Sequence, residues 1–357
     1  MNAELFDAVV LIEKERGIPR EYMHEKIAQA LITAFRKVNS GITDNVRVEL
    51  NEKKKEVHLY VEKQVVETVE QPALEIALPD ARQMEPGAAI GDVLTIEVPT
   101  STFGRIAAQT AKQMIMQGMR EAERGMVYQE YTSKEQDILT AQVLRHDSRS
   151  GALVLEMGTG NERTEVLLTP GEQAKGEFFR EGDRLKVYVV EVRKSARGPQ
   201  ILVSRTHPGL VKKLFELEVP EIKDGLVEIR SIAREPGSRT KMAVWANDSG
   251  IDPRGACIGP KSQRVNAVVS ELQGEKIDIV LYSDDAEIYI AQALAPAMVI
   301  KVMLSSDSKS CRVVVPNEQL SLAIGKEGQN ARLAARLTGY KIDIKPQTRE
   351  HEEYELF

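Results

Sequence analysis

The chain has 357 residues and a formal net charge of −6, with 42% hydrophobic and only 5% aromatic residues. This length exceeds one ordinary hydrophobic core and favours several domains with small aliphatic cores. The negative charge excludes a uniformly basic nucleic-acid binder, but it allows basic residues to be focused on one face.

The cysteine content and the N-terminus indicate the compartment. Two cysteines, Cys257 and Cys311, are too few for a disulfide framework, and we expect buried, inert thiols in a reducing cytosol. The first residues lack a basic targeting segment, and no apolar run approaches membrane-spanning length. We therefore expect a cytoplasmic protein with no membrane contact.

The first 130 residues predict an α+β domain. Apolar stripes at helical spacing, from Leu5 to Ile12 and from Ile27 to Val38, indicate two helices. Alternating patterns predict three strands, at Val46–Leu50, Val57–Val61 and Val93–Val98. A long helix is expected from Arg105 to Tyr128. Its methionines are either core residues or a deformable surface for another protein.

Residues 131–206 predict a small β-barrel. Five short strands are expected at Leu139–Val143, Leu153–Leu155, Val166–Leu168, Leu185–Val189 and Ile201–Val203. The OB class is the commonest barrel of this size that binds oligonucleotides. Four side chains are candidates for stacking on RNA bases, which contributes roughly 1–3 kcal/mol per base: Phe178, Phe179, Tyr188 and His146. One of the two phenylalanines is expected to fill the barrel core instead.

Residues 207–346 contain an internal repeat. Ile258-Gly259 returns 66 residues later as Ile324-Gly325, and residues 274–279 (Gly-Glu-Lys-Ile-Asp-Ile) return 65 residues later as 339–344 (Gly-Tyr-Lys-Ile-Asp-Ile). One residue is therefore gained or lost in the intervening helix. Two tandem copies of one module, at 207–282 and 283–346, are the economical interpretation, followed by a short acidic tail at 347–357.

The second copy carries the most specific motif. Residues 324–330 (Ile-Gly-Lys-Glu-Gly-Gln-Asn) lie between two helical stretches, as the G-x-x-G loop of a KH domain does. Glycine at 325 and 328 lets a sugar-phosphate backbone approach the main chain. The next helix offers its free N–H groups and its positive dipole end to a phosphate. Lys326, Asn330 and Arg332 can add charge or hydrogen bonds.

The first copy departs from this pattern. It reads Gly259-Pro260-Lys261-Ser262, with serine where the second glycine is expected. Serine carries a steric cost if this position needs a positive φ. Lys261 and Arg264 still supply charge, so an RNA contact and a mainly structural role both remain open.

Enzyme motifs are missing. Glu327 follows Gly325-Lys326, and Pro260 separates Gly259 from Lys261, so neither loop is a P-loop. The five histidines are scattered without metal-ligand spacing, and neither a nucleophile elbow nor a paired-cysteine zinc pattern occurs. We expect no catalytic activity, no cofactor and no metal.

Long stretches of the chain resemble the NusA family of bacterial transcription factors. They are residues 204–210 (Ser-Arg-Thr-His-Pro-Gly-Leu), 214–222, 231–235, 252–261 and 322–333. The resemblance implies an N-terminal RNA polymerase-binding domain (1–130), an S1 domain of OB fold (131–206) and two KH (type II) α/β domains. It implies RNA contacts by Gly259, Pro260, Lys261, Arg264, Gly325, Lys326, Glu327, Gly328, Gln329, Asn330 and Arg332.

The resemblance also implies a non-catalytic elongation factor. Its expected partners are the RNA polymerase core near the RNA exit channel, nascent single-stranded RNA and other Nus antitermination factors. It would modulate pausing, intrinsic termination and antitermination, and we expect a monomer. Because the sequence stops soon after the second KH domain, we do not expect the acidic C-terminal repeats of some family members or autoinhibition through them.

Two other functions compete with this one. Some exoribonucleases carry KH and S1 domains, but with KH before S1, whereas here the barrel comes first. A ribosome-assembly or translational RNA-binding protein would act without RNA polymerase. Co-purification with the polymerase core distinguishes that function from a transcription factor.

Overall fold

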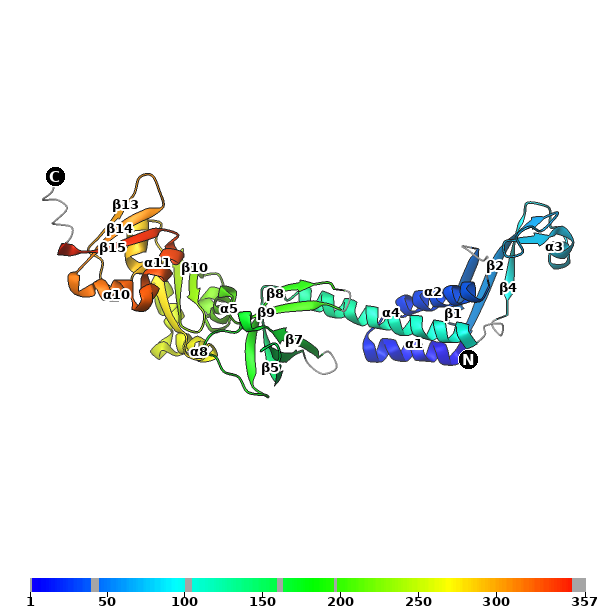
Figure 1. Cartoon of the computed structure of the whole chain (residues 1–357), viewed down its shortest axis with the longest axis horizontal. Helices are drawn as coiled ribbons and strands as arrows, with labels where there is room; N and C mark the ends of the chain where they lie inside the picture. Colours follow the sequence, from blue (N-terminus) through cyan, green and yellow to red (C-terminus); the bar gives the residue numbers. More distant parts are fainter. Residues whose placement is uncertain (1, 40–44, 100–104, 159–162, 196–197, 349–357) are drawn as a thin grey trace. The chain divides into compact units, whose positions relative to one another are not determined.

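The computed structural model describes residues 2–39, 45–99, 105–158, 163–195 and 198–348. The chain forms two compact units, Met1–Gln129 and Glu130–Phe357, and Figure 1 labels many of their elements. Among the described residues, no helix combines the length and the apolar composition that a membrane span requires.

The helices of the first unit follow the predicted apolar stripes. They are α1 (Asn2–Arg16), α2 (Arg20–Val38) and α4 (Arg105–Thr132), and α4 runs past the end of the unit. Val9, Met23 and Ile27 are buried in one cluster, against which Met119 and Met126 of α4 pack. At least these two methionines are therefore partly in the core, while Met116 is exposed.

A four-stranded sheet completes the first unit. It contains β1 (Val46–Asn51), β2 (Glu56–Val66), β3 (Glu75–Ala77) and β4 (Val93–Val98). Strands β1 and β2 form a hairpin, in which Asn51 pairs with Glu56 at the turn. The three-residue β3 and the short helix α3 (Leu78–Met84) were not predicted, since elements this short show no clear periodicity.

The second unit begins with the predicted barrel. Its strands are β5 (Ile138–His146), β6 (Leu153–Met157), β7 (Thr164–Leu168), β8 (Arg184–Arg193) and β9 (Gln200–Ser204). They form an antiparallel sheet in the order β7-β6-β5-β8-β9, and β7 also approaches β9, so the sheet curls towards a closed barrel. Alternate side chains such as Leu155, Val187 and Val203 are fully buried inside it. The OB-type prediction is confirmed.

The internal repeat folds as two copies of a three-stranded α/β module. The first contains α5 (Pro208–Glu218), α6 (Pro220–Lys223), β10 (Val227–Glu235), β11 (Arg239–Ala246), α7 (Pro253–Ile258), α8 (Gln263–Glu271) and β12 (Lys276–Leu281). The second contains α9 (Ala286–Ala293), β13 (Lys301–Leu304), β14 (Ser310–Val315), α10 (Leu320–Ile324), α11 (Gln329–Thr338) and β15 (Lys341–Pro346).

The two copies share their topology. Each sheet pairs its first two strands antiparallel and its last two strands parallel. The expectation that the shift of one residue lies within the helix is corrected. Helix α8 has nine residues and α11 ten, but four residues connect α8 to β12 and only two connect α11 to β15, so the first copy gains its extra residue after the helix. Both cysteines are buried, and burial raises the pKa of Cys257 to about 12 and that of Cys311 to about 11, so both thiols stay protonated.

The first copy packs directly on the second. The sheet face that turns away from α7 and α8 carries Ala233, Ala243 and Val280, which share one core cluster with α9 and α11. The Ser231 hydroxyl donates to the carbonyl oxygen of Leu337 at 2.9 Å. The small side chains of Ala233 and Ala243 let the two copies approach closely, and the hydrogen bond fixes the position of one copy on the other.

A buried arginine joins the barrel to the first copy. Arg205 follows β9 and is fully buried. Its guanidinium pairs with Glu177 of the barrel, with Glu271 of α8 at 2.9 Å and with the carbonyl oxygen of Lys186 at 2.7 Å. The ion pairs and the hydrogen bond offset the cost of desolvating the charge, which leaves the barrel and the first copy firmly connected.

Candidate nucleic-acid interface

The two predicted loops have the same backbone conformation. Gly259 and Gly325 end the preceding helices with φ/ψ of 73°/172° and 78°/169°. Lys261 (51°/32°) and Glu327 (53°/26°) follow two residues later, both left-handed. The helix after each loop, α8 or α11, then begins at once, with its first-turn N–H groups directed towards the loop.

The first glycine of each loop is required sterically. A Cβ at Gly325 would lie 2.8 Å from the backbone nitrogen of Asn330, and one at Gly259 would lie 2.7 Å from Cγ of Arg264. The loop therefore folds back tightly over the start of the next helix. Only glycine fits there without moving that helix or its side chain.

Ser262 tolerates the conformation that glycine adopts in the second copy. It has φ 60° and ψ 22°, against 73° and 14° for Gly328. A Cβ at Gly328 would meet only the Arg332 side chain, at 3.9 Å. The serine thus carries the strain of a left-handed residue but causes no clash, and the first loop keeps the geometry of the second.

Arg264 and Asn330 hold the loops from beneath. Asn330 is 4% exposed, and its Nδ2 donates to the carbonyl oxygens of Ala323 and Leu294, both at 3.0 Å. Arg264 donates to the Ala256 carbonyl oxygen at 2.7 Å and pairs with Glu221 at 2.8 Å. The expectation that the Asn330 side chain faces a strand of RNA is corrected, because its amide is buried inside the module.

Two further predicted residues of the second loop contact the first copy. The Gln329 amide donates to Glu235 at 2.9 Å and to Ser238 at 2.7 Å, and Arg332 pairs with Glu235. The hydrogen bond from Arg332 lowers the pKa of Glu235, which therefore remains ionised. The second loop is thus oriented relative to the first copy. Nothing in the sequence indicated Glu235 or Ser238, because they lie far away along the chain.

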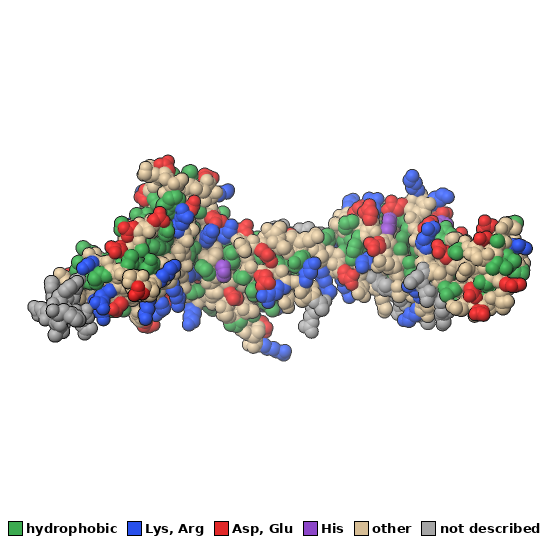
Figure 2. Space-filling model, turned by 90° about the horizontal axis from the view of Figure 1, so that it is seen from above, with side chains coloured by type: hydrophobic (Ala, Val, Ile, Leu, Met, Phe, Trp, Pro, Cys, Tyr) green, Lys and Arg blue, Asp and Glu red, His purple; other side chains and the backbone are tan. Residues whose placement is uncertain are grey.

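The remaining predicted loop residues point outward. Pro260, Lys261, Lys326 and Glu327 are all exposed. Each loop therefore presents one lysine beside a helix N-terminus, an arrangement that suits a phosphate. On the face drawn in Figure 2, basic and acidic side chains are interspersed.

The four barrel candidates divide into two pairs. The Phe178 side chain is 70% exposed and the His146 ring is also exposed, with its Nε2 2.9 Å from the Phe179 carbonyl oxygen. Phe179 (8%) and Tyr188 (7%) are buried. The prediction that these two rings stack on RNA bases is therefore corrected. Phe179 is the phenylalanine that fills the core.

Partners from the first repeat copy explain the burial of Tyr188 and the fixed backbone of Phe178. The Tyr188 ring stacks on His207, with centroids 4.6 Å apart. The Gln273 amide donates to the Phe178 carbonyl oxygen and accepts from its N–H, at 3.0 and 2.8 Å. Gln273 thus holds the Phe178 backbone while the ring stays outside, a role that no sequence pattern indicated.

Comparisons with known proteins match this architecture. Residues 4–125 match the family model of the NusA N-terminal domain, residues 205–282 that of the NusA-like first KH domain, and residues 286–352 that of the NusA-like second KH domain.

Three relatives are each named transcription termination/antitermination protein NusA. The chain is 49% identical to that of Halalkalibacterium halodurans, over 99% of this chain and 90% of the relative. It is 49% identical to that of Bacillus subtilis (98% and 92%) and 41% identical to that of Thermus thermophilus (97% and 90%).

Proposed function

Because this chain belongs to the NusA family of transcription termination/antitermination proteins, we propose that it binds the RNA polymerase core and nascent single-stranded RNA at the same time. The chain is a non-catalytic transcription factor with two RNA-binding KH domains. In the proposal it modulates pausing, termination and antitermination, and it does so together with other Nus factors.

The proposal divides the chain by task. Residues 1–130 bind the polymerase, 131–206 form an S1 barrel, 207–282 and 283–346 form the KH pair, and 347–357 form an acidic tail. The compact unit Met1–Gln129 supports the first division. The family matches at 205–282 and 286–352 support the KH boundaries.

One observation carries the RNA half of the proposal. Both loops hold the same left-handed backbone at the mouth of a helix, although their sequences differ at Ser262 and Gly328. Each site alone is small, but a polymerase-bound protein holds both near the emerging strand, which raises the effective RNA concentration. RNA affinity should fall with salt, as expected for phosphate contacts.

Substitution of the loop residues tests the proposal. We expect Gly325→Asp/Gly328→Asp to remove most RNA binding in an anisotropy titration, because two carboxylates would face the phosphates. The matched control is Gly225→Asp/Gly339→Asp, at two glycines of similar φ outside the loops where a Cβ meets nothing within 4 Å. Lys261→Asp/Lys326→Asp keeps all loop glycines and should also weaken binding. Unchanged RNA affinity in both loop variants would refute the RNA assignment.

A pull-down with core RNA polymerase tests the other half. We expect residues 1–130, in the full chain, to retain the polymerase in all of these variants, since the loops lie in the other unit. A pause-lifetime assay should then show that polymerase-bound loop variants lose their effect. RNA binding without any polymerase binding would favour a ribosome-assembly or translational role.

A further inference from the structure

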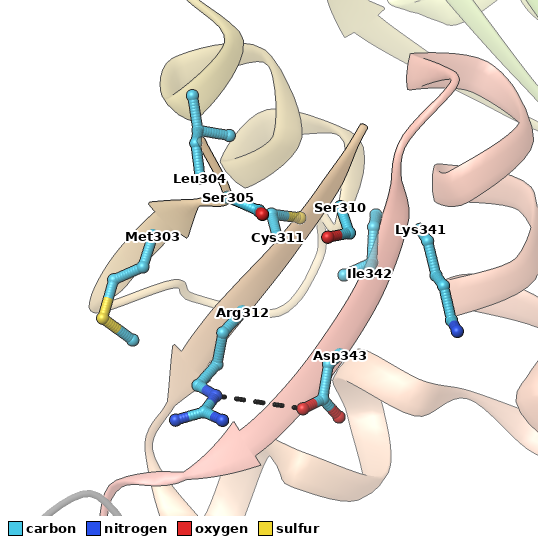
Figure 3. Close-up of a pocket in the computed structure, with 9 residues that line it drawn as sticks. All are labelled: Met303, Leu304, Ser305, Ser310, Cys311, Arg312, Lys341, Ile342 and Asp343. Atoms are coloured by element: carbon cyan, nitrogen blue, oxygen red, sulfur yellow. Dashed lines mark ion pairs between the residues drawn. The ribbon is translucent and has the colours of Figure 1, made fainter. Parts of the chain in front are cut away.

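A pocket of about 560 Å³ opens on the sheet of the second KH domain. Its lining includes Met303, Ser305, Ser310, Arg312, Lys341 and Asp343, from β13, β14, β15 and the β13–β14 connection. Figure 3 shows the Met303, Arg312 and Asp343 side chains on the same side of the strands. This is the side that turns away from the core cluster containing Val313 and Leu333. The pocket is therefore separate from the G-x-x-G loop.

The internal repeat allows this sheet face to be compared with the equivalent face of the first copy. Arg312 pairs in register with Asp343, as Lys241 pairs with Asp278. In the first copy the face is closed by the second KH domain: Lys241 is fully buried, and its Nζ donates to the Ala295 carbonyl oxygen at 2.8 Å. In the second copy Arg312 and Asp343 are 46% and 57% exposed, 3.9 Å apart. The same face of the sheet is therefore covered by protein in the first copy and exposed in the second.

The open copy has acquired positive charge. Ala243 of β11 has Ser231 and Val280 as its neighbours, whereas its counterpart Val314 has Lys301 and Lys345. Val314 is itself fully buried, and the pocket combines its charged side chains with apolar ones such as Met303 and Leu304. A sheet face that carries several cations complements a polyanion better than it complements an apolar helix.

The pocket residues match the chemistry of a nucleotide. The Arg312 guanidinium and the Lys341 ammonium can each hold a phosphate, and Asp343 orients the guanidinium. Ser308 links the hydroxyls of Ser305 and Ser310, at 3.3 and 2.7 Å, which places further donors at the pocket. Met303 supplies an apolar surface for a base.

We propose that this pocket binds one nucleotide of a single-stranded RNA. The phosphates on its two sides contact Arg312 and Lys341, one each, and its base lies against Met303. The site is additional to the loops and lengthens the stretch of RNA that the KH pair holds. It rests on the proposed function, because that function brings nascent RNA to this domain.

Charge removal at the pocket tests the inference in the full chain. The probe is a fluorescent single-stranded RNA of mixed sequence, about 15 nucleotides long, the upper range of such sites. Arg312→Gln/Lys341→Gln should weaken binding about tenfold and flatten the dependence of log affinity on log salt by about 1.4, or 0.7 for each lost contact. The control Lys212→Gln/Lys223→Gln removes two exposed charges from α5 and α6 and should change neither value.

The outcomes separate the pocket from the loops. An RNA that carries 4-thiouridine should photocrosslink to the peptide containing Met303, and less so in the pocket variant. Equal losses in the pocket and control variants would overturn the inference. So would full RNA affinity together with weakened polymerase binding, which would mark a protein surface. If only the loop variants lose RNA, the pocket inference alone fails; if no variant does, the proposed function fails as well.

Discussion

Asn330 lies directly beneath Gly325, and its side-chain amide ties the loop to α10 through the carbonyl oxygen of Ala323. Arg264 occupies the equivalent place beneath Gly259 and donates to the Ala256 carbonyl oxygen. Two chemically different side chains thus perform one structural task, which is to hold the glycine turn closed over the next helix.

Replacement of Asn330 by alanine should destabilise the second KH domain. The buried carbonyl oxygens of Ala323 and Leu294 would lose their donor, which costs about 1–3 kcal/mol. Urea unfolding should show this loss, and RNA binding should fall because the loop is released. Arg336→Ala, an exposed change on the same helix, serves as the control. A stability equal to that of the parent would contradict the supporting role of Asn330.

The two loop glycines should respond differently to substitution. Gly328→Ser should cost only about 1 kcal/mol, the strain of a left-handed residue, because Ser262 already adopts this conformation. Gly325→Ala should cost more and displace α11, since its Cβ would lie 2.8 Å from a backbone nitrogen. Thermal unfolding and RNA titration of both variants check this order. Similar effects of the two substitutions would contradict it.

The sequence predicted the features that local patterns encode. Strands such as β5 and β7 alternate because one face of each is buried, and the first glycine of each loop is required by its backbone. The shift of one residue between the copies was also predicted, although it lies in the connection after the helix and not in α8 or α11. These features depend on near neighbours along the chain, so a single sequence reveals them.

Contacts between modules could not be predicted in this way. Tyr188 alternates like an exposed strand residue, yet His207 and α5 cover it. Asn330 comes after the loop like a ligand-binding residue but bonds to Leu294, which is remote in sequence. The face around Lys241 is closed because the second KH domain packs on it, and no local pattern in the first copy encodes that contact.

Arg205 should be essential for the connection between the barrel and the first KH domain. Arg205→Met would leave Glu177 buried without its cation, and breaking such a buried pair costs about 3–5 kcal/mol. The midpoint of thermal unfolding should fall, and proteases should cut between the two modules. Arg145→Met removes the exposed partner of Glu165 and should shift stability by less than about 1 kcal/mol. Equal effects would refute the argument.

His207 should make the first KH domain sensitive to mild acid. Burial lowers its pKa below the ordinary 6.5, opposed by the charge of Glu172 and reinforced by that of Arg234. Its ring also accepts a hydrogen bond from the Gly209 N–H at 3.0 Å, which caps α5. The folded state therefore prefers the neutral ring.

That preference sets the sign of the pH effect. Above pH 6.5 both folded and unfolded chains carry a neutral His207, and the stabilisation is complete. As the pH falls from 6.5 towards the lowered pKa, the unfolded chain binds the proton first, so stability is lost. The melting temperature should therefore drop between about pH 7.5 and 5.5. His207→Asn keeps a capping acceptor without titrating and should remove this part of the drop. An unchanged pH profile in that variant would assign the effect to other groups.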